Sequence, residues 1–170
     1  DNGQYVLLSS EENVLFSVPH LNELFSEMFK AAHTRPELDG ELYCHGLSFE
    51  EIISITSRTQ NLHPNHRRIQ FHCFDMISDE PQMKRQLNIE SLRGISPWLV
   101  LSPFWLCLNL DEVMKVFETV CKDKYEGIIV RHQAAHYERK RSIYVMKFKP
   151  HQSDEYRIIG VQEEIDKEGL

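Results

Sequence analysis

The sequence predicts an α+β protein whose sheets are mostly antiparallel. Stretches with helical spacing of apolar residues and stretches with strand composition are mixed, without the strict alternation of a doubly wound fold. Neighbouring strand-like stretches, such as residues 126–131 and 142–149, are placed as hairpins would be. With 41% hydrophobic and 26% charged residues, the 170-residue chain has a globular composition and can bury a sizeable core.

The first half of the chain predicts two helices and three strands. Leucine, phenylalanine and methionine recur with helical spacing over residues 20–32 and indicate an amphipathic helix. Ser48 and Glu51 form a capping box that begins a second helix, which we expect to reach about Arg58. The expected strands are 4–8, 38–44 and the aromatic-rich 68–77.

The second half predicts two further helices. Residues 79–94 have a proline near the start and a glycine at the end, as helices commonly do. Residues 109–124 begin with Asn109 as a cap and carry apolar side chains along one side. The expected strands are 99–106, 126–131, 142–149 and 155–161.

Charge and composition exclude several classes of protein. The net charge of −7 argues against a surface that binds nucleic acid everywhere, although residues 139–149 hold five basic residues and no acid. We find no apolar run long enough to span a bilayer and no signal-peptide pattern. The four cysteines form no CxxC pair, which favours reduced thiols in a cytosolic protein.

Two lysines near the end of one predicted strand favour an anion site. Residues two apart in a strand point to the same face, so Lys147 and Lys149 present their ammonium groups side by side. Two parallel ammonium groups repel each other unless an anion lies between them, and phosphate suits this position. Taken alone, this pattern is most often a solvent-exposed strand edge.

Two acids and an aromatic ring complete the pattern of a nucleotide site. Glu41 and Glu126 each adjoin a glycine, which allows close approach of a ligand, and carboxylates suit Mg²⁺. Phe74 offers a ring on which a base can stack. An E-G pair is commonly only a turn and Phe74 alone would be a core residue, but together these features predict a nucleoside triphosphate site with a metal.

The residues that carry this pattern resemble a known family. "LDGEL", "FHCFDMI", "YEGIIVR" and "VMKFK" are similar to motifs III, IIIa, IV and V of the covalent nucleotidyltransferases, in the ATP-dependent DNA ligase branch. The resemblance spans about residues 1–162 and leans toward phage and bacterial single-subunit ligases. It implies two packed, mostly antiparallel sheets with flanking helices, an ATP-grasp-like nucleotidyltransferase core.

The resemblance implies a role for each candidate residue. Lys147 and Lys149 would bind the α-phosphate of ATP and, with Glu126, form the catalytic set. Glu126 and Glu41 would hold Mg²⁺ or Mn²⁺, with Glu41 alternatively contacting the ribose. Three further roles are a stacking ring for adenine at Phe74, a phosphate or DNA-backbone contact at Arg141, and a turn fixed by Asp39 that aims Glu41.

One family motif is missing from the chain. The nucleophilic lysine of the family lies in K-x-D-G, whereas the single Asp-Gly pair here, Asp39-Gly40, follows Glu37-Leu38. We therefore expect that lysine upstream, outside this chain, and expect the chain alone to form no covalent adenylate. Residues 1–152 would be an N-terminally truncated adenylation domain, and residues 153–170 a hinge and the start of a truncated OB-fold.

The implied activity of the intact parent is ATP-dependent sealing of nicks in double-stranded DNA, through lysyl-AMP and DNA-adenylate intermediates. The implied cofactors are ATP and Mg²⁺ or Mn²⁺, and the protein is expected to act as a monomer in the cytoplasm of a bacterial or phage-infected cell. DNA replication, repair and recombination all need such an enzyme, and the sequence does not distinguish among them.

Three alternatives remain open from the sequence. An RNA ligase or an mRNA-capping guanylyltransferase of the same superfamily would share these motifs. A non-catalytic nucleotide-binding remnant would explain the absence of motif I. A zinc-binding interaction module would use a possible ligand set of His63, His66, His72 and Cys73, although His72 and Cys73 alternate faces of the predicted strand.

Overall fold

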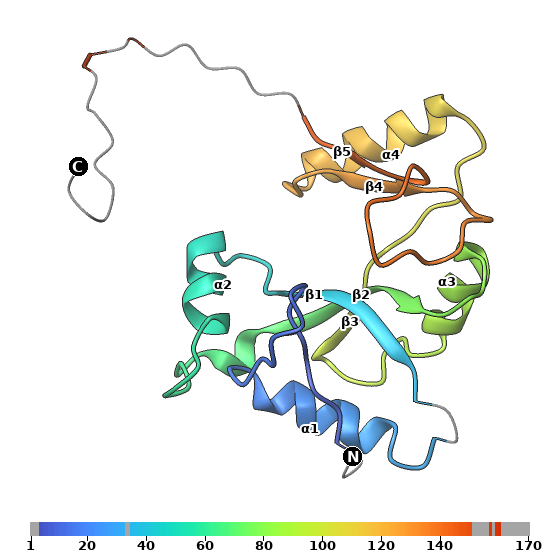
Figure 1. The fold of residues 1–170 in the computed structure, drawn as a ribbon. Helices are drawn as coiled ribbons and strands as arrows, with labels where there is room; N and C mark the ends of the chain where they lie inside the picture. The colour runs from blue at the N-terminus through green and yellow to red at the C-terminus, as the bar shows by residue number, and fades with distance from the viewer. Residues whose placement is uncertain (1–3, 33–34, 151–156, 158, 161–170) are drawn as a thin grey trace, which may run out of the picture.

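The protein is an α+β fold built on two small sheets, as predicted. The computed structural model describes residues 4–32, 35–150, 157, 159 and 160 (Figure 1). In the first sheet, β1 is antiparallel to β2 and β2 is parallel to β3; in the second, β4 and β5 are antiparallel. The elements in chain order are α1 (Pro19–Met28), β1 (Glu37–Tyr43), α2 (Phe49–Thr56), η1 (His66–Arg68), β2 (Gln70–Ile77), α3 (Gln82–Glu90), β3 (Leu99–Leu101), α4 (Leu110–Lys122), β4 (Ile128–Arg131) and β5 (Val145–Phe148).

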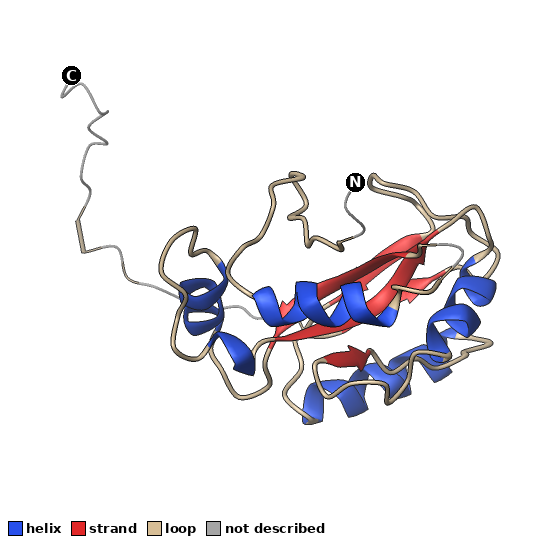
Figure 2. Cartoon of the chain, turned by 90° about the horizontal axis from the view of Figure 1, so that it is seen from below, coloured by secondary structure: helices blue, strands red, loops and turns tan. Residues whose placement is uncertain are grey.

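The hydrophobic core lies under the first sheet. Helix α1 lies in front of the sheet as seen from below in Figure 2, and its Phe25 contacts the ring of Phe71 in β2, with the ring centroids 5.3 Å apart. Alternate residues of β2 are buried, because successive side chains of a strand point to opposite faces. The buried apolar residues of this cluster are Leu7, Val18, Leu21, Phe25, Phe29, Ile52, Ile55, Ile69, Phe71, Cys73, Ile89, Leu99 and Leu101.

The second sheet is much less buried. Helix α4 covers its outer side (Figure 1), and Phe117 of α4 contacts Phe148 of β5 with the ring centroids 6.4 Å apart. None of the described residues of α4 is buried, although the helix carries its apolar residues on one side as the sequence predicts. A two-stranded sheet is too narrow to cover the apolar side of a 13-residue helix.

Both predicted helix caps are confirmed. The Ser48 hydroxyl accepts a hydrogen bond from the Glu51 amide at 3.2 Å, and the Glu51 carboxylate accepts one from the Ser48 amide at 2.8 Å. The Asn109 side chain accepts from the Glu112 amide at 3.0 Å. These bonds satisfy amide groups that the first turn of a helix leaves without partners.

Several predicted elements are shorter in the structure. Helix α1 ends at Met28, and the strand predicted over 99–106 ends at Leu101 as β3, before Pro103, which lacks a backbone donor. Residues 4–8 form only one isolated bridge, between Leu8 and Val14. Most of the strand predicted at 155–161, and most of the segment 153–170, lie outside the described residues.

All four cysteines are free thiols, with Cys73 buried in β2. Within the part of the chain that the structure describes, no helix combines the length and hydrophobicity needed to cross a bilayer.

Candidate functional site

Lys147, Lys149 and Glu126 form one ionic group at the edge of the second sheet. The Lys147 ammonium lies 3.1 Å from the Glu126 carboxylate, and Lys149 donates to the other oxygen of the same carboxylate. Lys147 in β5 and Lys149 just after this strand reach the same carboxylate, as expected for side chains two residues apart. All three side chains remain about half exposed or more, so the group is accessible to a ligand.

Gly127 allows this group to form. Its backbone has φ +154°, and a β-carbon there would overlap the carbonyl oxygen of Phe148. The strand β4 can therefore begin directly beside the end of β5 only because residue 127 has no side chain. This close approach brings the preceding residue, Glu126, within reach of both lysines.

The ionic contacts set the charge state of the group. Hydrogen bonds from Lys149 and then Lys147 lower the pKa of the Glu126 carboxyl. The same bond with Glu126 raises the pKa of Lys149. At neutral pH the group therefore has two positive charges and one negative charge, and its surplus charge is positive. An arriving phosphate would meet two ammonium donors, which bind phosphate through charge-assisted hydrogen bonds.

Glu41 lies on β1, in the sheet opposite this ionic group. Its neighbour Gly40 packs tightly, since a β-carbon there would lie 2.5 Å from the His72 carbonyl oxygen. Glu41 itself is exposed. The strand thus holds Glu41 at the surface while the adjacent glycine lets β1 and β2 come together.

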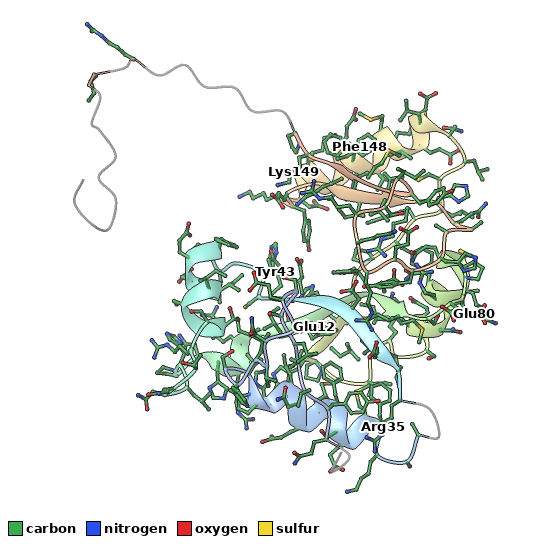
Figure 3. The ribbon with its side chains drawn as sticks, viewed as in Figure 1. Glu12, Arg35, Tyr43, Glu80, Phe148 and Lys149 are labelled. Carbon is green, nitrogen blue, oxygen red and sulfur yellow. The ribbon has the colours of Figure 1, made fainter. Side chains whose placement is uncertain are left out.

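A chain of rings connects this part of β1 to the second sheet. The ring of Tyr43 lies 6.2 Å from that of His45, which lies 5.5 Å from that of Tyr125. Tyr125 directly precedes Glu126. In Figure 3, Lys149 lies at the end of the second sheet that faces Tyr43, so the two predicted acids belong to segments joined by these rings.

Phe74 lies at an irregular position in β2. Asp39 pairs with Asp75 and Gly40 pairs with Cys73, so the register skips Phe74, as in a β-bulge. The Phe74 side chain is half-buried, and the guanidinium carbon of Arg131 lies 5.2 Å from its ring centroid. The ring therefore contacts a residue of the second sheet.

Asp75, the next residue, is completely buried and fully paired. Its carboxylate accepts two bonds from Arg85, at 2.8 and 3.1 Å, and one from Arg131. The other donors of Arg85 bind the carbonyl oxygens of Glu80 and Ala135 and the side chain of Gln82. All five N–H groups of Arg85 thus have an acceptor, which a buried guanidinium requires.

A cavity of about 360 Å³ lies beside these paired residues. Arg141, Lys140 and Ser142 line it together with Asp39 and Tyr137. The Tyr137 hydroxyl donates to Asp39 at 2.7 Å, and burial, with this bond to a carboxylate, raises the pKa of the phenol. Arg141 therefore borders a cavity of its own, next to Asp75 and Arg131, and is not a member of the Glu126 group.

A family model described as "ATP dependent DNA ligase domain" matches residues 1–149. The chain belongs to this family. The ligase domain is 26% identical over 160 residues to a DNA ligase of African swine fever virus, covering 88% of this chain and 37% of the relative. The chain therefore spans little more than a third of the length of that relative.

Solved structures show the same fold. The chain described as "Pmar-Lig_PreS3" superimposes with a TM-score of 0.74 at 16% identity, covering 88% of this chain and 38% of that one. The structure described as "New Crystal Structure of Chlorella Virus DNA Ligase-Adenylate" gives a TM-score of 0.67 at 18% identity, covering 88% and 56%. These likenesses confirm the predicted nucleotidyltransferase core as the fold of the ligase domain.

The candidate metal-ligating side chains of the ligase domain suit a metal ion only if a substrate supplies further ligands. Among the described residues, no group of three or more acidic, histidine or cysteine side chains is arranged to hold an ion. Glu41 and Glu126 contribute one carboxylate each. Mg²⁺ is commonly held by one or two carboxylates together with substrate phosphates and water, so the chemistry of the two side chains suits Mg²⁺, while none of the contacts among the described residues joins Glu41 to Glu126.

The zinc ligand set suggested by the sequence does not come together. The His66 ring bonds the carbonyl oxygen of His63 at 2.9 Å, and the His72 ring bonds Gln70. Cys73 points to the buried face of β2, away from His72.

Nothing in the sequence predicted the partners of Asp75, and Asp39 was predicted to fix a turn. Asp39 lies in the middle of β1 and accepts from Tyr137, so the predicted turn at Asp39 is wrong. One signal was present: an acid ending an apolar, aromatic strand needs a cation when it is buried. Arg85 and Arg131 are the cations that pair with Asp75. Neither could be predicted as its partner, because sequence spacing does not indicate which distant residues come into contact.

Proposed function

We propose that this chain is the adenylation domain of an ATP-dependent DNA ligase that seals nicks in double-stranded DNA through lysyl-AMP and DNA-adenylate intermediates. The proposal places the nucleophilic lysine outside these 170 residues. It treats residues 1–152 as the adenylation domain and residues 153–170 as a hinge and the start of an OB-fold. The parent would act as a monomer in the cytoplasm.

The observation that carries this proposal is the joint contact of Lys147 and Lys149 with Glu126. Because the carboxylate neutralises only one of the two ammonium groups, the group retains a positive charge for the α-phosphate of ATP. The two lysines would stabilise negative charge that develops on the phosphate during transfer. Phe74 would stack on adenine and Arg141 would bind phosphate or the DNA backbone.

If phosphate bound the ammonium groups of Lys147 and Lys149, their contacts with Glu126 would be broken, and its carboxylate would become available to a cation. We propose that Glu126 and Glu41 then hold Mg²⁺ or Mn²⁺, which would neutralise phosphate charge when bound. Glu126 would thus pair with the lysines in the absence of ATP and with the metal when ATP is bound.

Nucleotide binding by the chain tests the proposal directly. ATP with Mg²⁺ is titrated into the protein by calorimetry, and Lys147→Ala is compared with Lys115→Ala, an exposed lysine on α4. Loss of a charged hydrogen-bond donor at phosphate should weaken binding about tenfold or more, while Lys115→Ala should match the wild type. Equal affinity of wild type and Lys147→Ala would contradict the proposal.

Sealing assays separate the branches of the superfamily. In the protein that carries both this chain and the lysine, Lys147→Ala should abolish transfer of label from ATP to protein. Joining of nicked DNA in preference to nicked RNA supports a DNA ligase, and the reverse preference would support an RNA ligase. A GTP-specific transfer would support a capping guanylyltransferase, and no transfer at all would support a non-catalytic nucleotide-binding remnant.

A further inference from the structure

We infer that Arg131 is a positioning residue for Phe74, so that the expected base platform of the first sheet depends on a side chain of the second. This inference rests on the proposed function, because Phe74 has a base to receive only if the chain binds a nucleotide. In the sequence, Arg131 is merely the last residue of the stretch "YEGIIVR".

One guanidinium group contacts two consecutive residues of β2. The guanidinium carbon of Arg131 lies 5.2 Å from the centroid of the Phe74 ring, and its Nη1 donates to the carboxylate of Asp75. The same nitrogen lies 3.3 Å from the Gln82 side-chain oxygen. A cation over an aromatic face is attracted to it, and the attraction grows as water is removed. The Arg131 side chain is only 20% exposed.

The anchor of Arg131 is rigid. Asp75 is 0% exposed, and its carboxylate is already fixed by two bonds from Arg85, whose side chain is 2% exposed. The Met76 amide donates to the same carboxylate at 2.8 Å. A guanidinium that binds such a carboxylate has a defined position, and the Phe74 ring that packs against it is therefore held in place.

The bulge explains why Phe74 needs this support. Because the register passes from Asp75 directly to Cys73, Phe74 has no opposite residue in β1. A bulge re-aims the side chain of the extra residue, and the ladder no longer fixes its direction. Arg131 supplies the constraint that a regular strand pair would have given.

Arg131 also links the two halves of the nucleotide site. It is the last residue of β4, and Glu126 lies two residues before the first residue of the same strand. One end of β4 therefore contacts the Phe74 ring, which would receive the base. The segment before its other end carries Glu126, the carboxylate paired with Lys147. A change at residue 131 should disturb the base end of the site and leave the phosphate end in place.

The test compares two probes, ATP with Mg²⁺ and inorganic tripolyphosphate with Mg²⁺, by calorimetry on the full chain. Arg131→Met should weaken ATP binding about tenfold, the scale of one base–aromatic stack, and leave tripolyphosphate binding unchanged. Arg131→Lys, which keeps the cation, should recover part of the ATP affinity. The double variant Phe74→Ala/Arg131→Met should bind ATP no more weakly than Phe74→Ala alone, since Arg131 acts through the ring.

Arg93→Met is the matched control, because Arg93 pairs with Glu90 on the surface and is 54% exposed. It should leave both affinities at wild-type values. Equal weakening of both probes by Arg131→Met and by Arg131→Lys would mean a general structural role and would overturn the inference. Additive losses in the double variant, or no loss in Arg131→Met while Phe74→Ala loses affinity, would overturn it as well. If the wild type binds no ATP, the proposed function itself fails and the inference falls with it.

Discussion

The two sheets of this ligase domain are stabilised in different ways. The first sheet lies on α1 and belongs to a cluster of thirteen buried apolar residues, all between Leu7 and Leu101. In the second sheet, three of the four residues of β5 are exposed, and α4 has no buried residue among those described. Of the buried apolar residues in the described part of the chain, only Ala135 lies beyond residue 101.

The connection between the sheets is polar. Arg131 of β4 binds Asp75 of β2, and Arg85 of α3 binds both Asp75 and the Ala135 carbonyl oxygen. The core therefore stabilises one half of the proposed nucleotide site, while hydrogen bonds and ion pairs place the other half against it. Ionic and polar changes should therefore act most strongly at this junction.

The largest effect is expected from Asp75→Ala. This change leaves Arg85, with 2% of its side chain exposed, as a buried charge without its carboxylate, which costs about 3–5 kcal/mol of unfolding free energy. Urea unfolding followed by circular dichroism measures the loss. Glu37→Gln is the control, because it breaks an ion pair with Arg139 in which both side chains are over 60% exposed. The control should lose less than about 1 kcal/mol, and a similar loss in both variants would contradict a buried junction.

The two glycines beside the predicted acids should respond differently to alanine. Gly40→Ala forces a β-carbon against the His72 carbonyl oxygen inside the core sheet and should cost about 1–3 kcal/mol of global stability. Gly127→Ala forces β4 away from Phe148, so it should weaken tripolyphosphate binding more than it lowers the global unfolding free energy.

Gly46→Ala is the control for backbone strain alone. Gly46 has φ +86° with open space around it, and alanine there should cost about 1–2 kcal/mol without affecting binding. A tripolyphosphate affinity in Gly127→Ala equal to that of the wild type would contradict the role assigned to Gly127.

Thiol labelling should distinguish the buried core of the first sheet from the half-buried cysteines around it. Burial raises the pKa of the Cys73 thiol to about 12, so its reactive thiolate is scarce and inaccessible in the folded protein. Cys44, Cys107 and Cys121 are only half-buried. A maleimide reagent should therefore label these three under native conditions and Cys73 only after unfolding, as read by mass spectrometry of peptides. Early labelling of Cys73 would mean that the first sheet opens readily.

The smallest effect is the pH dependence of Glu126. Bonds from Lys149 and Lys147 lower its pKa below the usual 4.5, so the ionised carboxyl stabilises the folded state above that pH. The contribution disappears as pH falls through the lower, folded-state value. Because Glu126 is 66% exposed, the difference in stability between wild type and Glu126→Gln should stay below about 1 kcal/mol and shrink with added salt. A difference that grows with salt would contradict the ion pairs.

Local sequence signals predicted most elements of the fold. The capping box at Ser48 and the cap at Asn109 depend on residues three apart, so both helix starts could be read directly. The strand over residues 99–106 was predicted too long, because its apolar composition was given more weight than Pro103, which lacks a backbone donor. The parallel pairing of β2 with β3 also depends on contacts distant in sequence.

The candidate site was predictable where it depended on spacing. Lys147 and Lys149 share a face because they are two residues apart, and the structure adds their common partner, Glu126. Arg131 could not be predicted as a neighbour of Phe74, since the two are far apart in sequence and the bulge at Phe74 has no local signature.

The start of α3 limits how the neighbouring cavity can recognise a ligand. The first helix amides, of Gln82 and Met83, already donate to the carbonyl oxygens of Ala135 and Gln133. The positive end of the helix dipole is therefore occupied by the protein's own backbone and is closed to an incoming anion. An anion in that cavity would therefore be bound by long, exposed side chains such as Lys140 and Arg141. These side chains lose rotational freedom when they bind. An anion there should associate quickly and dissociate quickly.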